Sequence, residues 1–439
     1  MERLIQYKMR VWKDSDRRKP LIIRGARQVG KTYTIKEFGK KYFQHTVVID
    51  FEKERNIRTI FENSLEPQKI IQSLELITKK PIIPGKSLLF FDEIQACPDA
   101  IIALRYFYEE MKELHVIAAG SLLEFSISEI SFPVGRIQFL NMYPLNFQEF
   151  LLATGNDKAA TLISNVSMDI NEWEHDILLR ELRTYFFIGG MPESVKAFRE
   201  TASILESHEI HKELLQSFRE DFSKYAPQSD KQCIEDVFYN SAKNIGNQIK
   251  YTNLSDSFSS PTVKKALETL IKAKLITKVP SIHSLEPPLN SQINHKKFKI
   301  ILLDIGLWQQ LGGILPAHEI LETNLSNLYR GALAEQFVGQ ELLVGFNELR
   351  YWYKDKKSSN AEVDYILEKE NQAIPIEVKS GSAGSLKSLH QLFELNPETP
   401  YSIVFSSRLP GLIAEKKIIF LPLYFAGAIQ NAQFSLKPK

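Results

Sequence analysis

Eight consecutive residues near the start of the chain have the types and the spacing of a phosphate-binding loop. They are Gly25, Ala26, Arg27, Gln28, Val29, Gly30, Lys31 and Thr32. They match the pattern G-x-x-x-x-G-K-[ST], in which glycines let the backbone turn so that successive N–H groups face an anion. In this motif the lysine contacts the β- and γ-phosphates of a nucleotide, and the hydroxyl group after it binds Mg²⁺. These residues therefore predict an ATP-type nucleotide site.

The residues on either side of this loop predict the elements that the motif requires. The apolar run Leu21–Ile23 before the loop is typical of a buried parallel strand, and residues Tyr33–Phe38 after it are typical of a helix. That helix would add the positive end of its dipole to the anion site. The order strand, loop, helix favours a nucleotide site over a chance glycine–lysine turn.

A second apolar run, Ser87–Phe91, ends in the two carboxylates of Asp92 and Glu93. An uninterrupted apolar run is typical of a strand buried on both faces, and ligands bind at the carboxyl ends of such strands in open α/β sheets. There Asp92 can hold Mg²⁺, and Glu93 can polarise the attacking water, because phosphoryl transfer depends on positioning and charge compensation. Two acids at the end of a strand usually belong to a solvated turn. Together with the phosphate loop at 25–32, they predict a catalytic site for phosphoryl transfer.

Two more polar residues follow apolar runs in this region. Ser121 comes directly after His115–Gly120 and would lie at the same edge of the sheet, where its side chain either contacts the γ-phosphate or caps a helix. Arg136 follows Gly135 between two apolar stretches. It is either a surface side chain or an arginine finger for the nucleotide of its own or a neighbouring subunit. We expect Ser121 to bind nucleotide and Arg136 to be catalytic.

Size and composition limit the class of protein. At roughly 100–200 residues per domain, a chain of 439 residues predicts about two to four domains. The net charge of +2 excludes a globally basic surface, so any contact with nucleic acid must use a local patch. The two cysteines, Cys97 and Cys233, are far apart, which favours a reducing compartment. No signal-peptide core and no run of about 18 apolar residues is present, so we expect a cytoplasmic protein without a membrane partner.

The middle of the chain has no recognisable catalytic pattern. Residues from about 171 to 234 have helical periodicity, and Gly189-Gly190 predicts a turn between two helices. A helix-turn-helix with a following strand is predicted over 236–279, with Ser260 and Pro261 at the start of its second helix. Three side chains at that helix start would face DNA: Thr262, Lys264 and Lys265. The alternative is a module that only packs against other parts of the protein.

A second group of charged residues lies in the last third of the chain, in strands predicted over 351–353, 362–367 and 373–379. Side chains alternate across a strand, so Glu377 and Lys379 share one face, and Asp364 can join them from the neighbouring strand. Two carboxylates can hold Mg²⁺ at a scissile phosphate, while the lysine orients or deprotonates water. A solvated ladder of ion pairs is the alternative.

Longer segments of the chain are similar to one family of proteins. They include the phosphate loop, Phe90–Gln95, Gly135–Phe150, Phe186–Glu193, Asp221–Tyr225 and Leu303–Leu307. Over nearly its whole length the chain resembles prokaryotic AAA-type ATPases that carry a C-terminal domain of unknown function with a restriction-endonuclease-like fold. The resemblance implies ATP and Mg²⁺ as cofactors. It also implies that Glu335, in the predicted helix 331–338, is the helical acid that often completes such nuclease sites.

The predicted fold class is α/β: a P-loop NTPase parallel sheet, a helical lid, a winged helix and a C-terminal PD-(D/E)XK nuclease-like α/β domain. The predicted bounds of these parts are 1–160, 161–232, 233–300 and 301–439. The predicted function is Mg²⁺-dependent ATP hydrolysis coupled to the nuclease-like domain. The predicted catalytic residues are Glu93, Arg136, Asp364, Glu377 and Lys379, and the predicted metal ligands are Thr32, Asp92, Glu335, Asp364 and Glu377.

Two alternatives leave the C-terminal site inert. One is a nucleotide-controlled regulator that binds DNA, and the other is a protein-interaction switch without nucleic acid. ATP, DNA and further copies of the chain are the expected partners.

Overall fold

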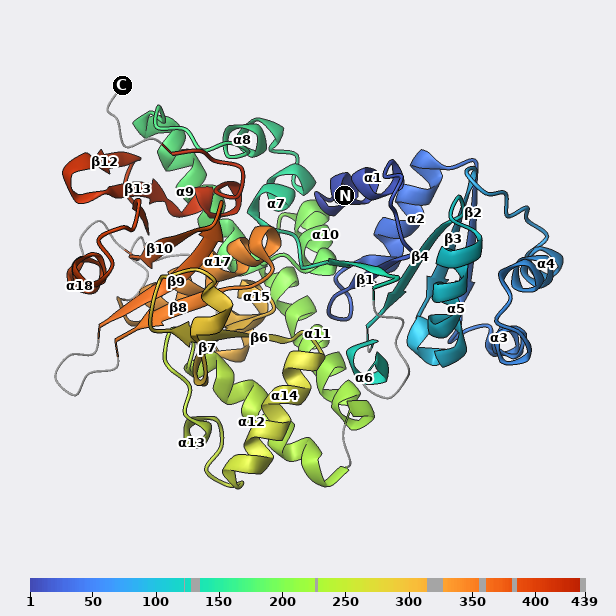
Figure 1. Cartoon of the computed structure of the whole chain (residues 1–439). Helices are drawn as coiled ribbons and strands as arrows, with labels where there is room; N and C mark the ends of the chain where they lie inside the picture. Colours follow the sequence, from blue (N-terminus) through green and yellow to red (C-terminus); the bar gives the residue numbers. More distant parts are fainter. Residues whose placement is uncertain are drawn as a thin grey trace. The chain divides into compact units, whose positions relative to one another are not determined.

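The computed structural model describes residues 1–121, 123–127, 135–225, 228–313, 327–354, 361–380 and 385–434 (Figure 1). The chain divides into two compact units. The N-terminal unit contains residues 2–143 and 272–274, and the C-terminal unit contains residues 144–271 and 275–439 together with Met1. The bounds of the four predicted domains stay a prediction, but the long continuous part of the N-terminal unit ends at Tyr143.

The N-terminal unit is built on a parallel sheet of five strands in the order β2-β3-β4-β1-β5. The strands are β1 (Leu21–Arg24), β2 (His45–Asp50), β3 (Ser87–Asp92), β4 (His115–Gly120) and β5 (Gln138–Asn141). All six residues of β3 and all six of β4 are buried, as their apolar runs predict. Because β4 lies between β1 and β3, the loop after β1 and the carboxylates after β3 come from strands that are not neighbours.

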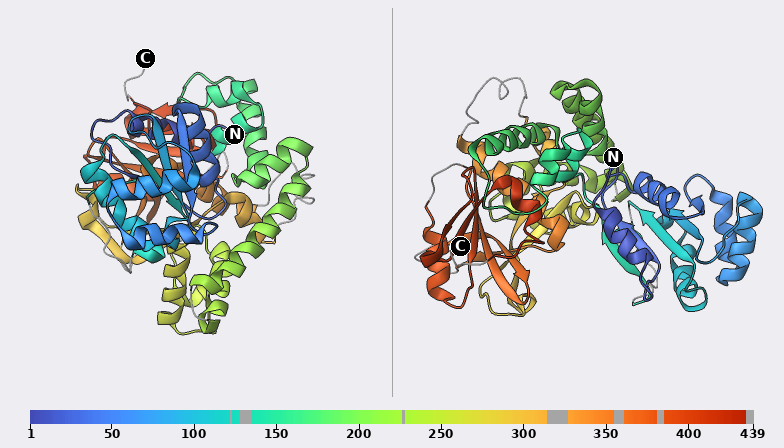
Figure 2. Two further views of the ribbon diagram at one scale, coloured as in Figure 1. Left: turned by 90° about the vertical axis from the view of Figure 1, so that its right-hand side faces the viewer. Right: turned by 90° about the horizontal axis from the view of Figure 1, so that it is seen from above.

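Helices lie on both faces of this sheet (Figure 1; Figure 2, right). They are α1 (Ile5–Lys13), α2 (Lys31–Tyr42), α3 (Arg58–Asn63), α4 (Pro67–Thr78), α5 (Pro98–Glu110) and α6 (Leu123–Ile127), with the 3-10 turns η1 (Arg55–Ile57) and η2 (Ile94–Ala96). On one face the rings of Phe51, Phe61 and Phe91 meet at 5.3–5.6 Å between centroids, within a buried apolar cluster. This core fixes the end of β3, and so the position of Asp92.

The C-terminal unit contains a mixed sheet of eight strands in the order β12-β13-β11-β10-β9-β8-β6-β7. The strands are β6 (Ile276–Ile282), β7 (Ile293–Leu302), β8 (Arg350–Tyr353), β9 (Glu362–Lys369), β10 (Gln372–Val378), β11 (Ser402–Ser406), β12 (Gly411–Ile413) and β13 (Ile418–Pro422). The antiparallel pair β6–β7 follows the predicted helix-turn-helix, and β6 also pairs in parallel with β8. Residues of the predicted winged-helix segment therefore complete the sheet of the C-terminal segment.

The remaining described helices belong mostly to this unit. They are α7 (Phe147–Ala153), α8 (Asp157–Leu162), α9 (Glu172–Ile188), α10 (Pro192–Thr201), α11 (Ile204–Tyr225), α12 (Gln228–Lys243), α13 (Tyr251–Leu254), α14 (Ser260–Lys272), α15 (Ile305–Leu311), α17 (Asn327–Phe346) and α18 (Lys387–Leu395), with the 3-10 turns η3 (Leu289–Gln292), η4 (Ala414–Lys416) and η5 (Leu423–Ala428). Within the described parts of the chain, no helix is both long and apolar enough to cross a membrane.

Two glycines and one buried aspartate join the helical region to the segment after β7. Asp304 caps α15 by accepting hydrogen bonds from the N–H groups of Gly306 and Leu307 at 2.9 and 3.1 Å, and its second oxygen accepts one from Gly190 at 2.6 Å. Gly189 has φ of +65°, and a Cβ there would lie 2.2 Å from Asp304 Oδ1. The segments around Gly189 and Asp304, which both carry the family resemblance, thus fit together as a structural joint.

Candidate functional site

The phosphate loop connects β1 to α2 in a conformation that fits an anion. Gln28 and Gly30 have φ of +66° and +92°, so the backbone curls before the helix begins. The N-cap of α2 is Gly30, which has no side chain to cap the helix, so this position leaves room for a phosphate at the first N–H groups. Gly25 packs closely, because a Cβ there would lie 2.2 Å from the carbonyl oxygen of Met142. The loop is thus shaped by both of its glycines.

Lys31 is folded into this loop. Its Nζ donates hydrogen bonds to the carbonyl oxygens of Gly25 and Ala26 at 3.0 and 2.8 Å, and the residue is 7% exposed. Burial lowers the pKa of Lys31 to about 8, although the nearby charges of Glu93 and Asp92 oppose this shift. A phosphate in the loop would supply the counter-charge that these carbonyl groups provide only in part.

Thr32 and Asp92 come together from α2 and β3. The Thr32 hydroxyl group donates to Asp92 Oδ1 at 3.1 Å, which joins residues sixty positions apart in the sequence. Burial raises the pKa of Asp92 to about 6, and the hydrogen bond from Thr32 opposes this shift. Mg²⁺ is commonly held by one or two such protein oxygens together with substrate phosphates, so this pair fits the ion that accompanies a nucleotide.

The Glu93 carboxylate is anchored by neighbours from two segments. Gln95 Nε2 donates to Glu93 Oε2 at 2.6 Å, and the backbone N–H of Ser121 donates to the same oxygen at 3.4 Å. Gly120 makes room for Gln95, since a Cβ at Gly120 would lie 2.0 Å from Gln95 Oε1. One carboxylate oxygen of Glu93, Oε2, is therefore held by both contacts. The sequence motifs did not single out Gln95, although it lies two residues after the acid.

The structure does not bring Arg136 to the phosphate loop of its own chain. Strand β5 pairs in parallel with β1, with Gln138 opposite Leu21, so Arg136 lies beyond the amino edge of the sheet. The phosphate loop follows the carboxyl end of β1, on the opposite edge. Arg136 Nε instead donates to Glu109 Oε1 at 2.5 Å, and Glu109 also binds Arg105. An action of Arg136 on the nucleotide of its own chain does not fit this position.

In the C-terminal unit, Glu335 and Asp364 meet around a lysine that the sequence motifs did not indicate. Lys299 on β7 is 2% exposed, and its Nζ lies 2.8 Å from Glu335 Oε1 and 3.4 Å from Asp364 Oδ1. Glu362 on β9 pairs with the same ammonium group. Burial alone would lower the pKa of Lys299, but the three carboxylates hold it well above its usual value. The sequence did hold one indication of this lysine: it is the single charged residue in the apolar run from Phe298 to Leu302, and a buried lysine is rare unless it is paired.

Glu377 and Lys379 lie beside this cluster at the end of β10. Lys379 Nζ donates to Glu377 Oε1 at 2.6 Å, and the N–H of Val378 donates to Asp364 Oδ2 at 2.8 Å. Burial raises the pKa of Glu377, the charge of Asp364 adds to this, and Lys379 opposes it. No group of three His, Cys, Asp or Glu side chains among the described residues is arranged to hold a metal. One oxygen each of Glu335, Asp364 and Glu377 pairs with an ammonium group instead.

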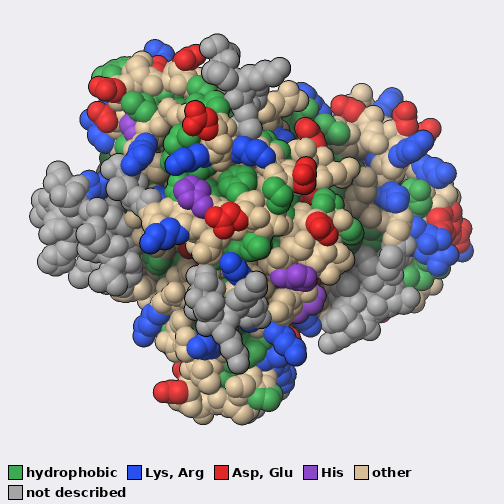
Figure 3. Space-filling view, turned by 60° about the vertical axis from the view of Figure 1, so that its left-hand side comes forward, with side chains coloured by type: hydrophobic (Ala, Val, Ile, Leu, Met, Phe, Trp, Pro, Cys, Tyr) green, Lys and Arg blue, Asp and Glu red, His purple; other side chains and the backbone are tan. Residues whose placement is uncertain are grey.

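The predicted DNA-facing lysines are exposed on α14, and each has an acidic neighbour. Lys265 Nζ lies 3.0 Å from Asp230 Oδ2, and Lys264 Nζ lies 3.8 Å from Glu268 Oε1. On the face drawn in Figure 3, the coloured basic and acidic side chains are interspersed rather than gathered by sign. That face therefore lacks the broad basic area that usually marks a nucleic-acid surface.

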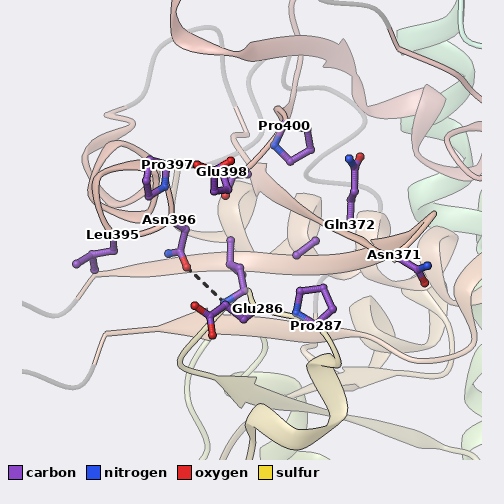
Figure 4. A pocket seen from close by; sticks show the side chains of 12 residues that line it. Glu286, Pro287, Asn371, Gln372, Leu395, Asn396, Pro397, Glu398 and Pro400 are labelled. Carbon is purple, nitrogen blue, oxygen red and sulfur yellow. Dashed lines mark hydrogen bonds between the residues drawn. The ribbon is translucent and has the colours of Figure 1, made fainter.

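A pocket of about 240 Å³ lies in the C-terminal unit, at the β9–β10 turn (Figure 4). Its lining includes Glu286, Pro287, Asn371, Gln372, Asn396 and Pro400. Asn396 Oδ1 accepts a hydrogen bond from the N–H of Leu285 at 3.4 Å across one side. Asp364 and Glu377 lie toward the other end of the β9–β10 hairpin, so the pocket does not contain the predicted chemistry.

Three protein-family models match parts of the chain. Residues 17–151 match the model of an AAA domain, which includes the phosphate loop and both carboxylates after β3. Residues 17–151 are thus similar to AAA domains. Downstream of the AAA domain, residues 179–318 and 330–424 match two models described as domains of unknown function, DUF8612 and DUF4143.

Several known proteins are similar to this chain. An uncharacterized protein of Methanocaldococcus jannaschii is 21% identical over 418 residues, which cover 89% of this chain and 82% of that protein. A Walker-type ATPase of Pyrococcus abyssi is 15% identical with a TM-score of 0.44, covering 70% of this chain and 94% of that one. The Orc1 protein of Aeropyrum pernix, solved in complex with DNA, is 9% identical with a TM-score of 0.27. The match covers 72% of this chain and 92% of the Orc1 chain.

Proposed function

We propose that this protein is a Mg²⁺-dependent ATPase that hydrolyses ATP in its AAA domain. The main support is the 3.1 Å contact between Thr32, on the phosphate loop, and Asp92, at the end of β3, with Glu93 next to it. This contact supports a site in which a phosphate cradle, two oxygen ligands and a carboxylate share one edge of the sheet. It is what phosphoryl transfer to water needs from a protein.

Each residue of this site has a separate role. Lys31 exchanges the carbonyl groups of the loop for phosphate oxygens, and the first N–H groups of α2 bind the same phosphates. Thr32 and Asp92 would hold Mg²⁺ beside a bound nucleotide, and the ion would supply compensation of the phosphate charge. Glu93 orients the water through Oε1 and receives its proton, while Gln95 holds Oε2. We propose that the Ser121 side chain contacts the γ-phosphate. The backbone N–H of Ser121 donates to Glu93, so this residue is close to the catalytic carboxylate.

Arg136 acts, in this proposal, on the nucleotide of a neighbouring subunit. Its place beyond the amino edge of the sheet supports a role between subunits and not within one. Glu109 and its partner Arg105 would hold it ready at the surface. The proposal implies a homo-oligomer in which one chain completes the site of the next.

For the C-terminal unit we propose a nuclease-like fold whose movement is coupled to ATP hydrolysis. The order of α17, β8, β9, β10 and α18 supports such a fold, because it repeats the order helix acid, strand aspartate, strand Glu-x-Lys and helix. Metal-dependent cleavage by Asp364, Glu377 and Lys379 has less support, since ammonium groups already pair with the acids. We therefore favour a nucleotide-controlled module that binds a partner, with DNA as the candidate, over a nuclease.

Two variants test the ATPase proposal. Lys31→Ala should abolish binding of ATP, because Lys31 contacts phosphates in the ground state, whereas Glu93→Gln should bind ATP and lose turnover. Binding is measured with a fluorescent ATP analogue, and turnover by Mg²⁺-dependent release of phosphate. The proposal fails if the unmodified protein releases no phosphate. The assigned roles fail if both variants lose binding equally.

A further inference from the structure

The cation at the centre of the C-terminal carboxylates is a side chain of the protein itself. Strand β7 is separated from β9 by β6 and β8 in the sheet order, yet Lys299 on β7 contacts two carboxylates of β9. Its Nζ passes 5.5 Å from the ring centroid of Tyr351 on β8 before it reaches Glu362 and Asp364 on β9. Glu335 on α17 closes the cluster from above the sheet at 2.8 Å. One ammonium group thus gathers three carboxylates from two elements.

The surroundings hold Glu335 in this arrangement. The Tyr365 hydroxyl group donates to the backbone oxygen of Glu335 at 2.9 Å, and a Cβ at Gly339 would lie 2.4 Å from that hydroxyl oxygen, so α17 lies close against β9. Glu335 Oε2 lies against Gly246, where a Cβ would be 3.0 Å away. The other oxygen, Oε1, is the one that pairs with Lys299. The acid is therefore fitted to a cation that comes from β7.

We propose that the ammonium group of Lys299 permanently fills the cation position of this cluster, so that the C-terminal unit binds no divalent metal there. A metal shared by Glu335 and Asp364 would lie within about 3 Å of Nζ, where two like charges in a site shielded from water repel strongly. The ammonium group is not able to leave easily, because Lys299 is 2% exposed and its strand is paired with β6 through Val279. Outside this cluster, Glu377 pairs with Lys379 through Oε1, and its buried Oε2 has no hydrogen-bond partner among the described residues.

This proposal concerns the C-terminal unit alone and does not depend on ATP hydrolysis in the AAA domain. The carboxylates would act as a structural ion cluster that ties β7, β9 and α17 together. A nuclease-like fold would then keep its acids without their metal chemistry, and cleavage would be lost without loss of the acidic residues. Removal of the internal cation should leave three acids that a divalent ion can share.

The test is a Mn²⁺ titration of the full chain without nucleotide, followed by electron paramagnetic resonance or calorimetry. The unmodified protein should show no bound Mn²⁺ that depends on Asp364. Lys299→Met should gain one Mn²⁺ per chain, and the additional change Asp364→Asn should remove it. Lys296→Met is the matched control, because Lys296 is an exposed lysine of the same strand and should gain nothing.

Folding of the Lys299→Met variant is followed by thermal unfolding with and without Mn²⁺. If removal of the ammonium group destabilises the unit, Mn²⁺ should raise the unfolding midpoint by several degrees in this variant and not in the unmodified protein. The proposal is overturned if the unmodified protein binds one Mn²⁺ and loses it with Asp364→Asn. It is also overturned if the folded Lys299→Met variant binds no Mn²⁺. The titration of the unmodified protein decides the question even if the variant does not fold.

Discussion

The contact between Gln95 and Glu93 gives a quantitative prediction for catalysis. A Cβ at Gly120 would lie 2.0 Å from Gln95 Oε1, whereas such contacts are not found below 3.0 Å, so Gly120→Ala must push the Gln95 amide away by about 1 Å. The 2.6 Å hydrogen bond to Glu93 is then broken. Gln95→Ala removes the same bond directly. Hydrogen bonds to charged groups contribute about 1.5–3 kcal/mol.

If this bond orients Glu93 in the transition state, its loss should lower kcat about 10- to 100-fold in both variants. KM for ATP should change little, because we assign Glu93 to the attacking water and not to the phosphates. The assay is steady-state release of phosphate, with nucleotide binding measured in parallel. A double variant supplies the control: in the Glu93→Gln background, Gln95→Ala should have no additional effect. Unchanged kcat in Gln95→Ala, or additive effects in the double variant, would refute the positioning role.

Three further predictions concern pH, assembly and stability. Since burial raises the pKa of Asp92 to about 6 and only the ionised carboxylate binds Mg²⁺, kcat/KM for MgATP should fall about tenfold per pH unit below 6; an acid limb that begins below pH 5 would contradict this. Mixing Arg136→Ala with Lys31→Ala protein should restore part of the ATPase activity if Arg136 acts between subunits, whereas normal turnover by Arg136→Ala alone would make it a surface residue. Asp304→Ala should destabilise the C-terminal unit by about 3 kcal/mol, from a lost helix cap and an unpaired N–H at Gly190, as measured by urea unfolding; a loss below about 1 kcal/mol would exclude the joint as a major contact.

Elements with a strong local pattern could be predicted from the sequence. The helix predicted over Tyr33–Phe38 lies within α2, and the apolar run His115–Gly120 forms β4 with those bounds. The first follows a phosphate-loop motif, which requires a helix directly after it. In the second, burial on both faces requires an unbroken apolar run. The turn at Gly189-Gly190 is also present, since α9 ends at Ile188 and α10 begins at Pro192.

Features that depend on pairing between distant segments could not be predicted. The position of β4 between β1 and β3 has no local signature, and it decides how far Asp92 lies from the phosphate loop. The place of Arg136 becomes clear only from the register of β5 against β1. Lys299 was hidden for the same reason, because its partners come from segments that lie 36 and 65 residues later in the chain. The sequence showed which side chains are charged, but it did not show which of them contact one another in the fold.

The membership of β6 and β7 in the C-terminal sheet affects how the protein is made. During synthesis this hairpin emerges before β8, so β6 has an unpaired edge until the ribosome has added the residues up to Tyr351 and Trp352, its partners. An unpaired strand edge can pair with other chains and so promotes aggregation. Pairing between strands that are far apart in the sequence also slows folding. A fragment that begins after Leu302 would have the opposite defect, since β8 would lose its neighbour and become an exposed edge. Expression of the last third alone should therefore yield aggregates, and a soluble fragment should need to begin upstream of Ile276.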